Sequence, residues 1–242
     1  MIQLEHVTKT YLTKVVVDDV TATFPTGKIV GVIGENGSGK STLLKLMAGL
    51  IRPSKGTVTI SGRPATRRIS DTVAYLSESE TLYRQFTIAE TVNFFASQFR
   101  DFNLQKATEL MHFMQLDPQK KVSHLSKGHR GRLKMALVLA RDVPVILLDE
   151  PLSGLDQFVR SAIVESLLSF LDLEKQTVIL TTHELMELET ILDVVVAIRA
   201  GKIVAMSDVE TVREVAGQSL VAWLKNVYET KTNGLGGRND AS

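Results

Sequence analysis

The chain has 242 residues, of which 44% are hydrophobic and 23% charged, a composition typical of a globular protein with one sizeable core. The formal net charge of +1 gives no electrostatic footprint for DNA or RNA, and the lack of cysteine excludes disulfides, thiolate metal sites and cysteine nucleophiles. No apolar run approaches the ~18 residues of a membrane span, and residues 1–6 do not resemble an export signal. We therefore expect any membrane span to belong to another chain.

Three short strands are predicted near the start, over residues 2–7, 15–24 and 56–62. Polar and apolar residues alternate in the second and third of them, which favours an antiparallel sheet with one face in solvent. Tyr11 lies between the first two strands and could stack on an adenine ring. Simple packing explains this tyrosine equally well.

Residues 34–42 form a glycine-rich loop between an apolar run at 29–33 and a segment at 43–50 with helical spacing of apolar residues. Strand, glycine loop and helix in this order are the context of a phosphate-binding loop. Its glycines free the backbone to aim several N–H groups at one anion, and the helix adds its positive N-terminal end. A chance match in a glycine turn is less probable in this context, so the sequence predicts a nucleoside triphosphate site.

Each residue of the loop is a candidate ligand of that nucleotide. Lys40 supplies a point charge for the β- and γ-phosphates, and the Ser41 hydroxyl can ligate Mg²⁺. The candidates are Gly34, Glu35, Asn36, Gly37, Ser38, Gly39, Lys40, Ser41 and Thr42.

A helical insertion is predicted after a strand at 72–77. Helical patterns at 88–99, 104–115 and 127–141 lie between two strands of the expected nucleotide core, so they form an inserted lobe rather than a sequential domain. We expect one domain over 1–229, with its core at 1–77 and 143–218, the lobe at about 78–142 and a disordered tail at 230–242.

The run Val145–Leu148 is apolar throughout, which predicts an interior strand of a parallel sheet that is covered on both faces. Two acids follow at its carboxyl end, where open α/β sheets place their ligands. Asp149 would hold Mg²⁺, and Glu150 would orient and deprotonate the attacking water. An acidic strand end that leads into a proline turn is the structural alternative.

The remaining pattern predicts a helix at 158–171, a strand at 177–182 that ends at His183, strands at 193–199 and 202–206, and helices at 208–216 and 219–229. A lone histidine is more often structural than catalytic. His183, however, follows a strand's carboxyl end and could reach the γ-phosphate. The other histidines, His6, His112, His124 and His129, have no such setting and are treated as ordinary residues.

Taken in this order, the elements resemble the ATP-binding subunit of an ABC transporter over roughly residues 1–220. The resemblance rests on the phosphate loop, the helical lobe, Leu125–His129 before a helix, Asp149 with Glu150, Ser153–Asp156 and His183. It implies a P-loop ATPase fold of the α/β class, with a mixed central sheet, an antiparallel β subdomain and an inserted α-helical subdomain.

The resemblance also implies a site shared by two chains that face each other head to tail. Residues 125–129, here named the signature segment, would place Ser126 and Gly128 on the γ-phosphate bound by the partner chain. Asp156 would link the two halves and Tyr11 would stack on adenine. Glu150 would be the general base and His183 the γ-phosphate partner. ATP and Mg²⁺ are the implied cofactors.

Three positions depart from the family pattern. Lys127 stands where a glycine is usual, with His129 in place of glutamine two residues later. Lys127 could assist the γ-phosphate, or it could be part of a solvated basic face, since residues 119–141 carry seven lysines and arginines and no acid. Glu78 stands where a glutamine usually ligates Mg²⁺; a glutamate can still ligate the metal.

By resemblance, the expected partners are an integral membrane subunit and a second copy or a paralogous ATPase subunit, without nucleic acid. The expected location is the cytoplasmic face of the cell membrane. The helical lobe would dock on the membrane subunit, with Phe86, Phe94, Phe95 and Phe99 either lining that groove or packing the lobe's own core. Lys127 and Glu78 favour an exporter-type system. The alternative is an ABC-type ATPase without a transport role, in translation or repair, or a non-hydrolysing scaffold.

Overall fold

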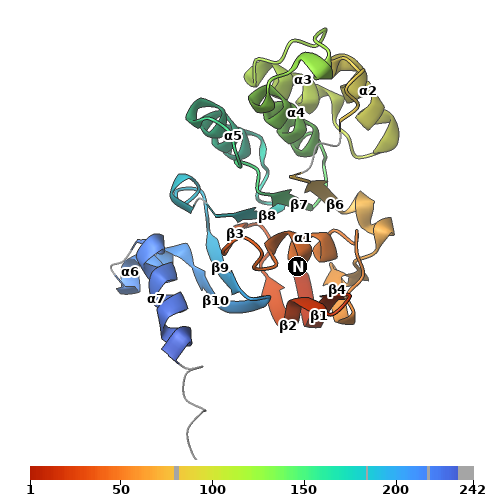
Figure 1. The fold of residues 1–242 in the computed structure, drawn as a ribbon. Helices are drawn as coiled ribbons and strands as arrows, with labels where there is room; N and C mark the ends of the chain where they lie inside the picture. The colour runs from red at the N-terminus through yellow and green to blue at the C-terminus, as the bar shows by residue number, and fades with distance from the viewer. Residues whose placement is uncertain (79–81, 184, 217–218, 234–242) are drawn as a thin grey trace, which may run out of the picture.

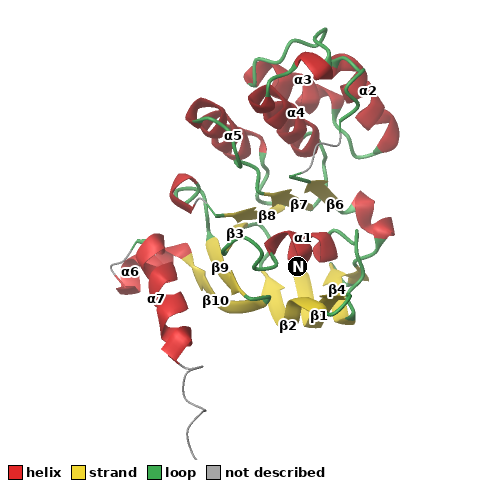
Figure 2. Cartoon of the chain, viewed as in Figure 1, coloured by secondary structure: helices red, strands yellow, loops and turns green. Residues whose placement is uncertain are grey.

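The computed structural model describes residues 1–78, 82–183, 185–216 and 219–233, and its arrangement is drawn in Figure 1. Two β-sheets form the lower and middle parts of the view, and a group of helices stands above them. Figure 2 shows the same division by secondary structure.

The first sheet is antiparallel, with the strand order β2 (Lys14–Phe24), β1 (Ile2–Tyr11), β4 (Lys55–Ile60) and β5 (Arg63–Pro64). This confirms the predicted antiparallel pairing. β1 is longer than the expected strand at 2–7, because shifts in register after Leu4 let it stay paired with β2 as far as Tyr11 opposite Lys14.

The second sheet has the order β10 (Lys202–Asp208), β9 (Val194–Arg199), β3 (Ile29–Ile33), β8 (Thr177–Thr182), β7 (Val145–Asp149) and β6 (Val73–Leu76). All neighbours are parallel except β10 and β9, so the sheet is mixed, as predicted. β7 is buried along its whole length between β8 and β6. Five parallel strands therefore end at one edge of the sheet.

Helix α1 (Lys40–Met47) packs its apolar face between the two sheets. Leu43, Leu44, Leu46 and Met47 are fully buried with side chains of β1 and β3 in one apolar cluster. This packing fixes α1, and with it the loop that precedes the helix, against the end of β3.

The upper group of helices contains α2 (Ile88–Gln98), α3 (Leu104–Phe113) and α4 (Lys127–Leu139), with α5 (Gln157–Phe170) beside it (Figure 1). α4 is buried along its second half and shares an apolar cluster with α3, α5 and β7. The phenylalanines of α2 contact one another, and Phe95 also packs on this cluster. Short 3₁₀ turns occur at Arg67–Asp71, Val122–His124 and Leu185–Glu187.

The chain returns to the core in α6 (Val209–Ala216) and α7 (Leu220–Asn233), which lie beside β9 and β10 (Figure 1). α7 extends to Asn233, four residues beyond the predicted helix end at 229, and the disordered tail stays a prediction. Residues 234–242 lie outside the described residues. Among the described residues, no helix combines the length and apolarity needed to cross a bilayer.

Candidate nucleotide-binding site

The phosphate loop leaves β3 at Gly34 and enters α1 at Lys40. Gly37 and Gly39 have φ angles of +80° and +106°, a region that L side chains rarely adopt, and a Cβ on Gly39 would lie 2.6 Å from the Val16 carbonyl oxygen. The Lys40 ammonium donates to the carbonyl of Gly34 at 2.8 Å and to that of Glu35 at 3.3 Å. These contacts fold the lysine back over its own loop.

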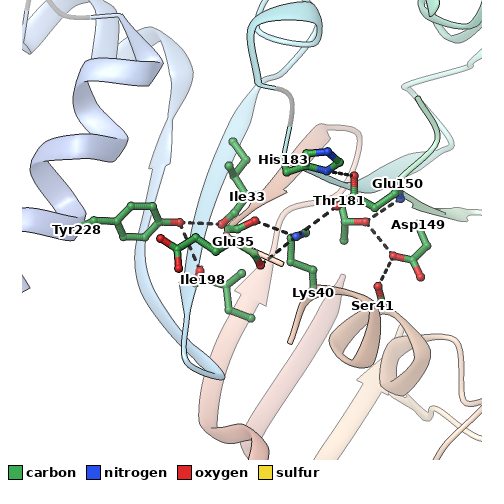
Figure 3. Close-up of polar contacts among 11 residues, drawn as sticks. Ile33, Glu35, Lys40, Ser41, Asp149, Glu150, Thr181, His183, Ile198 and Tyr228 are labelled. Atoms are coloured by element: carbon green, nitrogen blue, oxygen red, sulfur yellow. Dashed lines mark hydrogen bonds and ion pairs between the residues drawn. The ribbon is translucent and has the colours of Figure 1, made fainter. Parts of the chain in front are cut away.

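Asp149, at the end of β7, accepts hydrogen bonds from three hydroxyl groups around it. Oδ1 accepts from Ser41 at 2.8 Å and from Thr181 at 2.9 Å (Figure 3). Oδ2 accepts from Tyr75 at 2.9 Å. Burial, and next the negative charge of Asp149, raise the pKa of Tyr75 well above its usual range, so its hydroxyl keeps the proton that it donates. The aspartate thus connects α1, β6 and β8.

Glu150 lies between Lys40 and His183. One carboxylate oxygen is 3.2 Å from the Lys40 ammonium and the other accepts from His183 Nδ1 at 2.8 Å (Figure 3). The side chains of Lys40 and Glu150 are only 5% and 10% exposed, so their ion pair is poorly screened by solvent. Glu150 has a φ of +48°, and its backbone N–H donates to Thr181 Oγ1 at 2.9 Å. Such strained backbone at a non-glycine residue is typical of functional sites.

These side chains line a hollow of about 390 Å³ beside the phosphate loop. Of the predicted site residues, the structure brings Glu78, Glu150 and His183 to this hollow together with the loop. Among the described residues, the lining consists of Val16, Asn36, Gly37, Gly39, Lys40, Ser41, Thr42, Glu78, Glu150, Ser153 and His183.

Tyr11 is not among these lining residues. It lies at the end of β1, 44% exposed, with the Lys9 ammonium 5.1 Å from its ring centroid. Val16 of the neighbouring strand lines the hollow instead. Stacking of Tyr11 on adenine therefore stays a prediction.

The signature segment starts α4. Ser126 caps the helix by accepting from the backbone N–H of His129, and its hydroxyl lies 2.7 Å from His129 Nδ1. A Cβ on Gly154 would lie 2.0 Å from the Lys127 ammonium, and one on Gly128 would lie 3.7 Å from an Asp156 oxygen. The segment therefore contacts the turn that follows Glu150 in the same chain.

A second hollow of about 150 Å³ joins the signature segment to the acidic residues. Lys127, Glu78, Glu150 and Ser153 all line it, whereas Ser126 and Gly128 line neither hollow. Lys127 thus faces the catalytic candidates of its own chain, and the two small signature residues do not.

Sequence reasoning missed Thr181, Tyr75 and the role of His129, and it gave Ser153 no role of its own within the Ser153–Asp156 motif. Thr181 and Tyr75 sit near the carboxyl ends of β8 and β6, next to β7 in the sheet. Polar residues near the carboxyl ends of these strands are visible in the sequence, and parallel neighbouring strands end at the same edge of a sheet. To place Thr181 and Tyr75 beside Asp149, however, the order of the strands must be known. His129 was treated as an ordinary residue, and its bond to Ser126 shows that it shapes the signature segment.

The residues that could hold Mg²⁺ are Ser41 and Asp149, whose oxygens lie 2.8 Å apart, and Glu78, which lines the same hollow as Ser41. Hard oxygen ligands suit Mg²⁺, which keeps several waters and takes its other ligands from phosphates. The described residues include no group of three or more His, Asp or Glu side chains that could hold a metal alone. This sparse donor set fits a metal that arrives with a phosphate ligand.

Comparison with known proteins agrees with this geometry. Residues 17–153 match the family model described as ABC transporter. The chain belongs to the ABC transporter family. It is 36% identical over 209 residues to the Nod factor export ATP-binding protein I of Sinorhizobium fredii (strain NBRC 101917 / NGR234), which aligns with 83% of this chain and 61% of that protein. The chain therefore spans less than two thirds of that relative's length.

Other similar proteins belong to the same family. The ABC transporter ATP-binding protein NatA of Bacillus subtilis (strain 168) is 30% identical over 211 residues, with 82% of this chain and 84% of NatA aligned. A solved structure titled "Structure of ATP binding subunit of ABC transporter" superposes with a TM-score of 0.83 at 25% identity, covering 94% of this chain and 99% of that one. The expected fold, an ABC ATPase core with an inserted helical group, is confirmed.

Proposed function

We propose that this chain is the ATP-binding and hydrolysing subunit of an ABC transporter. The observation that carries the proposal is the joint position of the Lys40 ammonium, the Glu150 carboxylate and His183 in one hollow beside the phosphate loop. ATP hydrolysis requires a cation that binds the phosphates and a residue that orients or deprotonates the attacking water, and Lys40 and Glu150 are suited to these roles.

The chemistry of hydrolysis follows from these contacts. When ATP binds, the Lys40 ammonium would leave its ion pair with Glu150 and pair with the β- and γ-phosphates. The Glu150 carboxylate would then be free to take a proton from the attacking water. His183 donates from Nδ1 to Glu150, so it can donate to a γ-phosphate oxygen only if Nε2 also carries a proton. Bound Mg²⁺ would neutralise phosphate charge, and Ser41, Asp149 and Glu78 are its proposed ligands.

The proposed assembly is a head-to-tail dimer. Ser126 and Gly128 line neither hollow of their own chain, which supports a role for the signature segment on a nucleotide held by a second copy or a paralogous subunit. Asp156, beside Gly128, would couple the two halves. ATP would close the dimer and hydrolysis would open it.

The proposed location is the cytoplasmic face of a membrane, on a separate transporter subunit. Export is the proposed direction, because five relatives that are 33–36% identical to this chain over the aligned residues are named for Nod factor export. The cargo would be selected by the membrane subunit.

Lys40→Ala tests this function directly. Loss of the phosphate-facing charge should lower ATP turnover by about 10²-fold or more, measured as phosphate release with Mg-ATP. Lys45→Ala, one turn further along α1, is the matched control and should retain turnover. Near-normal turnover of Lys40→Ala would contradict the proposed site.

A further inference from the structure

Helix α7 places one side chain against the start of the phosphate loop. The Tyr228 hydroxyl lies 3.2 Å from the carbonyl oxygen of Ile33 and 3.4 Å from that of Ile198, so its single hydrogen can be shared between them (Figure 3). Ile33 is the last residue of β3, and Gly34 of the loop follows it. The hydroxyl therefore touches the backbone at the point where strand becomes loop.

The two carbonyls belong to neighbouring parallel strands. β3 and β9 are paired up to Ile33 opposite Ala197, one residue before Ile198. Space there is tight, since a Cβ on Gly34 would lie 2.3 Å from the Ile198 carbonyl oxygen. A hydrogen-bond donor at this corner can fix the first turn of the loop relative to β9.

α7 is itself held in place at several points. Leu220 and Leu224 are buried, and Trp223 and Val227 pack on the main apolar cluster. Arg199, which follows Ile198 in β9, donates to the Tyr228 carbonyl at 2.9 Å. The tyrosine is thus anchored independently of its hydroxyl.

The phenol is also kept in the donating form. Burial, and then the negative charge of Glu35, raise the pKa of Tyr228. The hydroxyl therefore remains protonated across the physiological pH range.

We propose that Tyr228 is a positioning residue for the phosphate loop, holding the Ile33 and Ile198 carbonyls together so that the loop is preorganised for nucleotide phosphates. The inference rests on the proposed nucleotide-binding function. Tyr228 acts at a distance from the reacting atoms: the next carbonyl, that of Gly34, accepts from the Lys40 ammonium. Movement of Ile33 and Gly34 displaces this anchor of the lysine.

Such a role affects binding more than chemistry. The loop holds the β-phosphate of both ATP and ADP, so loss of preorganisation weakens both nucleotides by a similar factor. Glu150 and His183 are held from β7 and β8 and keep their mutual contact. The rate constant kcat should therefore change less than the KM for ATP.

The test is Tyr228→Phe, which removes the hydroxyl and keeps the packed ring. The Kd values for ADP and for Mg-free ATP are measured by titration at a temperature well below that of unfolding. Each should rise about fivefold, the factor that corresponds to one net hydrogen bond of about 1 kcal/mol.

Tyr83→Phe is the matched control, since Tyr83 lies just before α2 and its ring contacts Phe86 and Phe94 of the helical group. An unchanged Kd in Tyr228→Phe, or a rise that Tyr83→Phe shares, would overturn the positioning role. A wild-type chain that binds neither nucleotide would instead refute the proposed function, so the two failures are distinguishable.

Discussion

Asp149 illustrates how single hydroxyl groups define the site. This aspartate is buried, and its carboxylate is satisfied by Ser41, Thr181 and Tyr75. If Mg²⁺ binds here, only Ser41 would have to give up its hydrogen bond to Asp149, because its hydroxyl oxygen would ligate the metal. Tyr75 would continue to orient the carboxylate.

Tyr75→Phe should therefore lower the free energy of unfolding by about 1 kcal/mol, because one hydrogen bond to a buried acceptor is lost while two remain. It should also raise the Mg²⁺ concentration that gives half-maximal ATP turnover. Urea unfolding and a Mg²⁺ titration measure the two effects. If the variant equals the wild type in both its free energy of unfolding and its Mg²⁺ requirement, the Tyr75 hydroxyl does not orient the Asp149 carboxylate.

His129 gives the signature segment a dependence on pH. Burial first, then the positive charges of Arg132 and Lys120, lower the pKa of His129 below its ordinary value of about 6.5. At neutral pH the ring is uncharged, so Nδ1 can accept the Ser126 hydroxyl proton. The folded form thus favours the neutral ring, and this contribution to stability is present above the ordinary pKa and decreases as the pH falls through the lowered one.

The comparison with His129→Gln isolates this effect. Glutamine can also accept from Ser126 but does not gain a proton. The unfolding temperature of the wild type should fall relative to that of the variant between pH 7 and pH 5. A difference that stays constant over this range would contradict the assignment.

At the scale of elements, α4 brings the unusual Lys127 against the turn after Glu150. Its charge would favour a nucleotide phosphate near the start of this helix. Lys127→Gln should weaken the ATP-induced dimer by about two- to fivefold at low salt, the range of a partly exposed charge contact, and by less at high salt. Sedimentation equilibrium measures this. Lys121→Ala, an exposed lysine before the helix, is the control; equal effects from both would indicate only a general basic surface.

Most elements were predictable because each has a local signal. The glycine loop between strand and helix, the apolar β7 and the capped α2 were found within a few residues of their observed limits. What could not be predicted depends on contacts between elements distant in sequence. Thr181 needed the order β8–β7–β6, and Tyr228 needed the docking of α7, 195 residues after the carbonyl that it contacts.

At the scale of the whole molecule, the chain carries two separate parts of the proposed ATP site. The phosphate loop, Asp149, Glu150 and His183 converge on one hollow, whereas Ser126 and Gly128 lie on the helical side and line none of it. A second copy in head-to-tail orientation would bring the missing signature residues to the nucleotide. Turnover should then rise more steeply than linearly with protein concentration.

The most direct test of this shared site is the mass in solution of Glu150→Gln, without nucleotide and with Mg-free ATP. The substitution keeps the shape of the side chain and removes the base, so bound ATP is not consumed. We expect 26.7 kDa without ATP and twice that mass with ATP. A mass of 26.7 kDa under both conditions would contradict a site completed by a second copy of this chain.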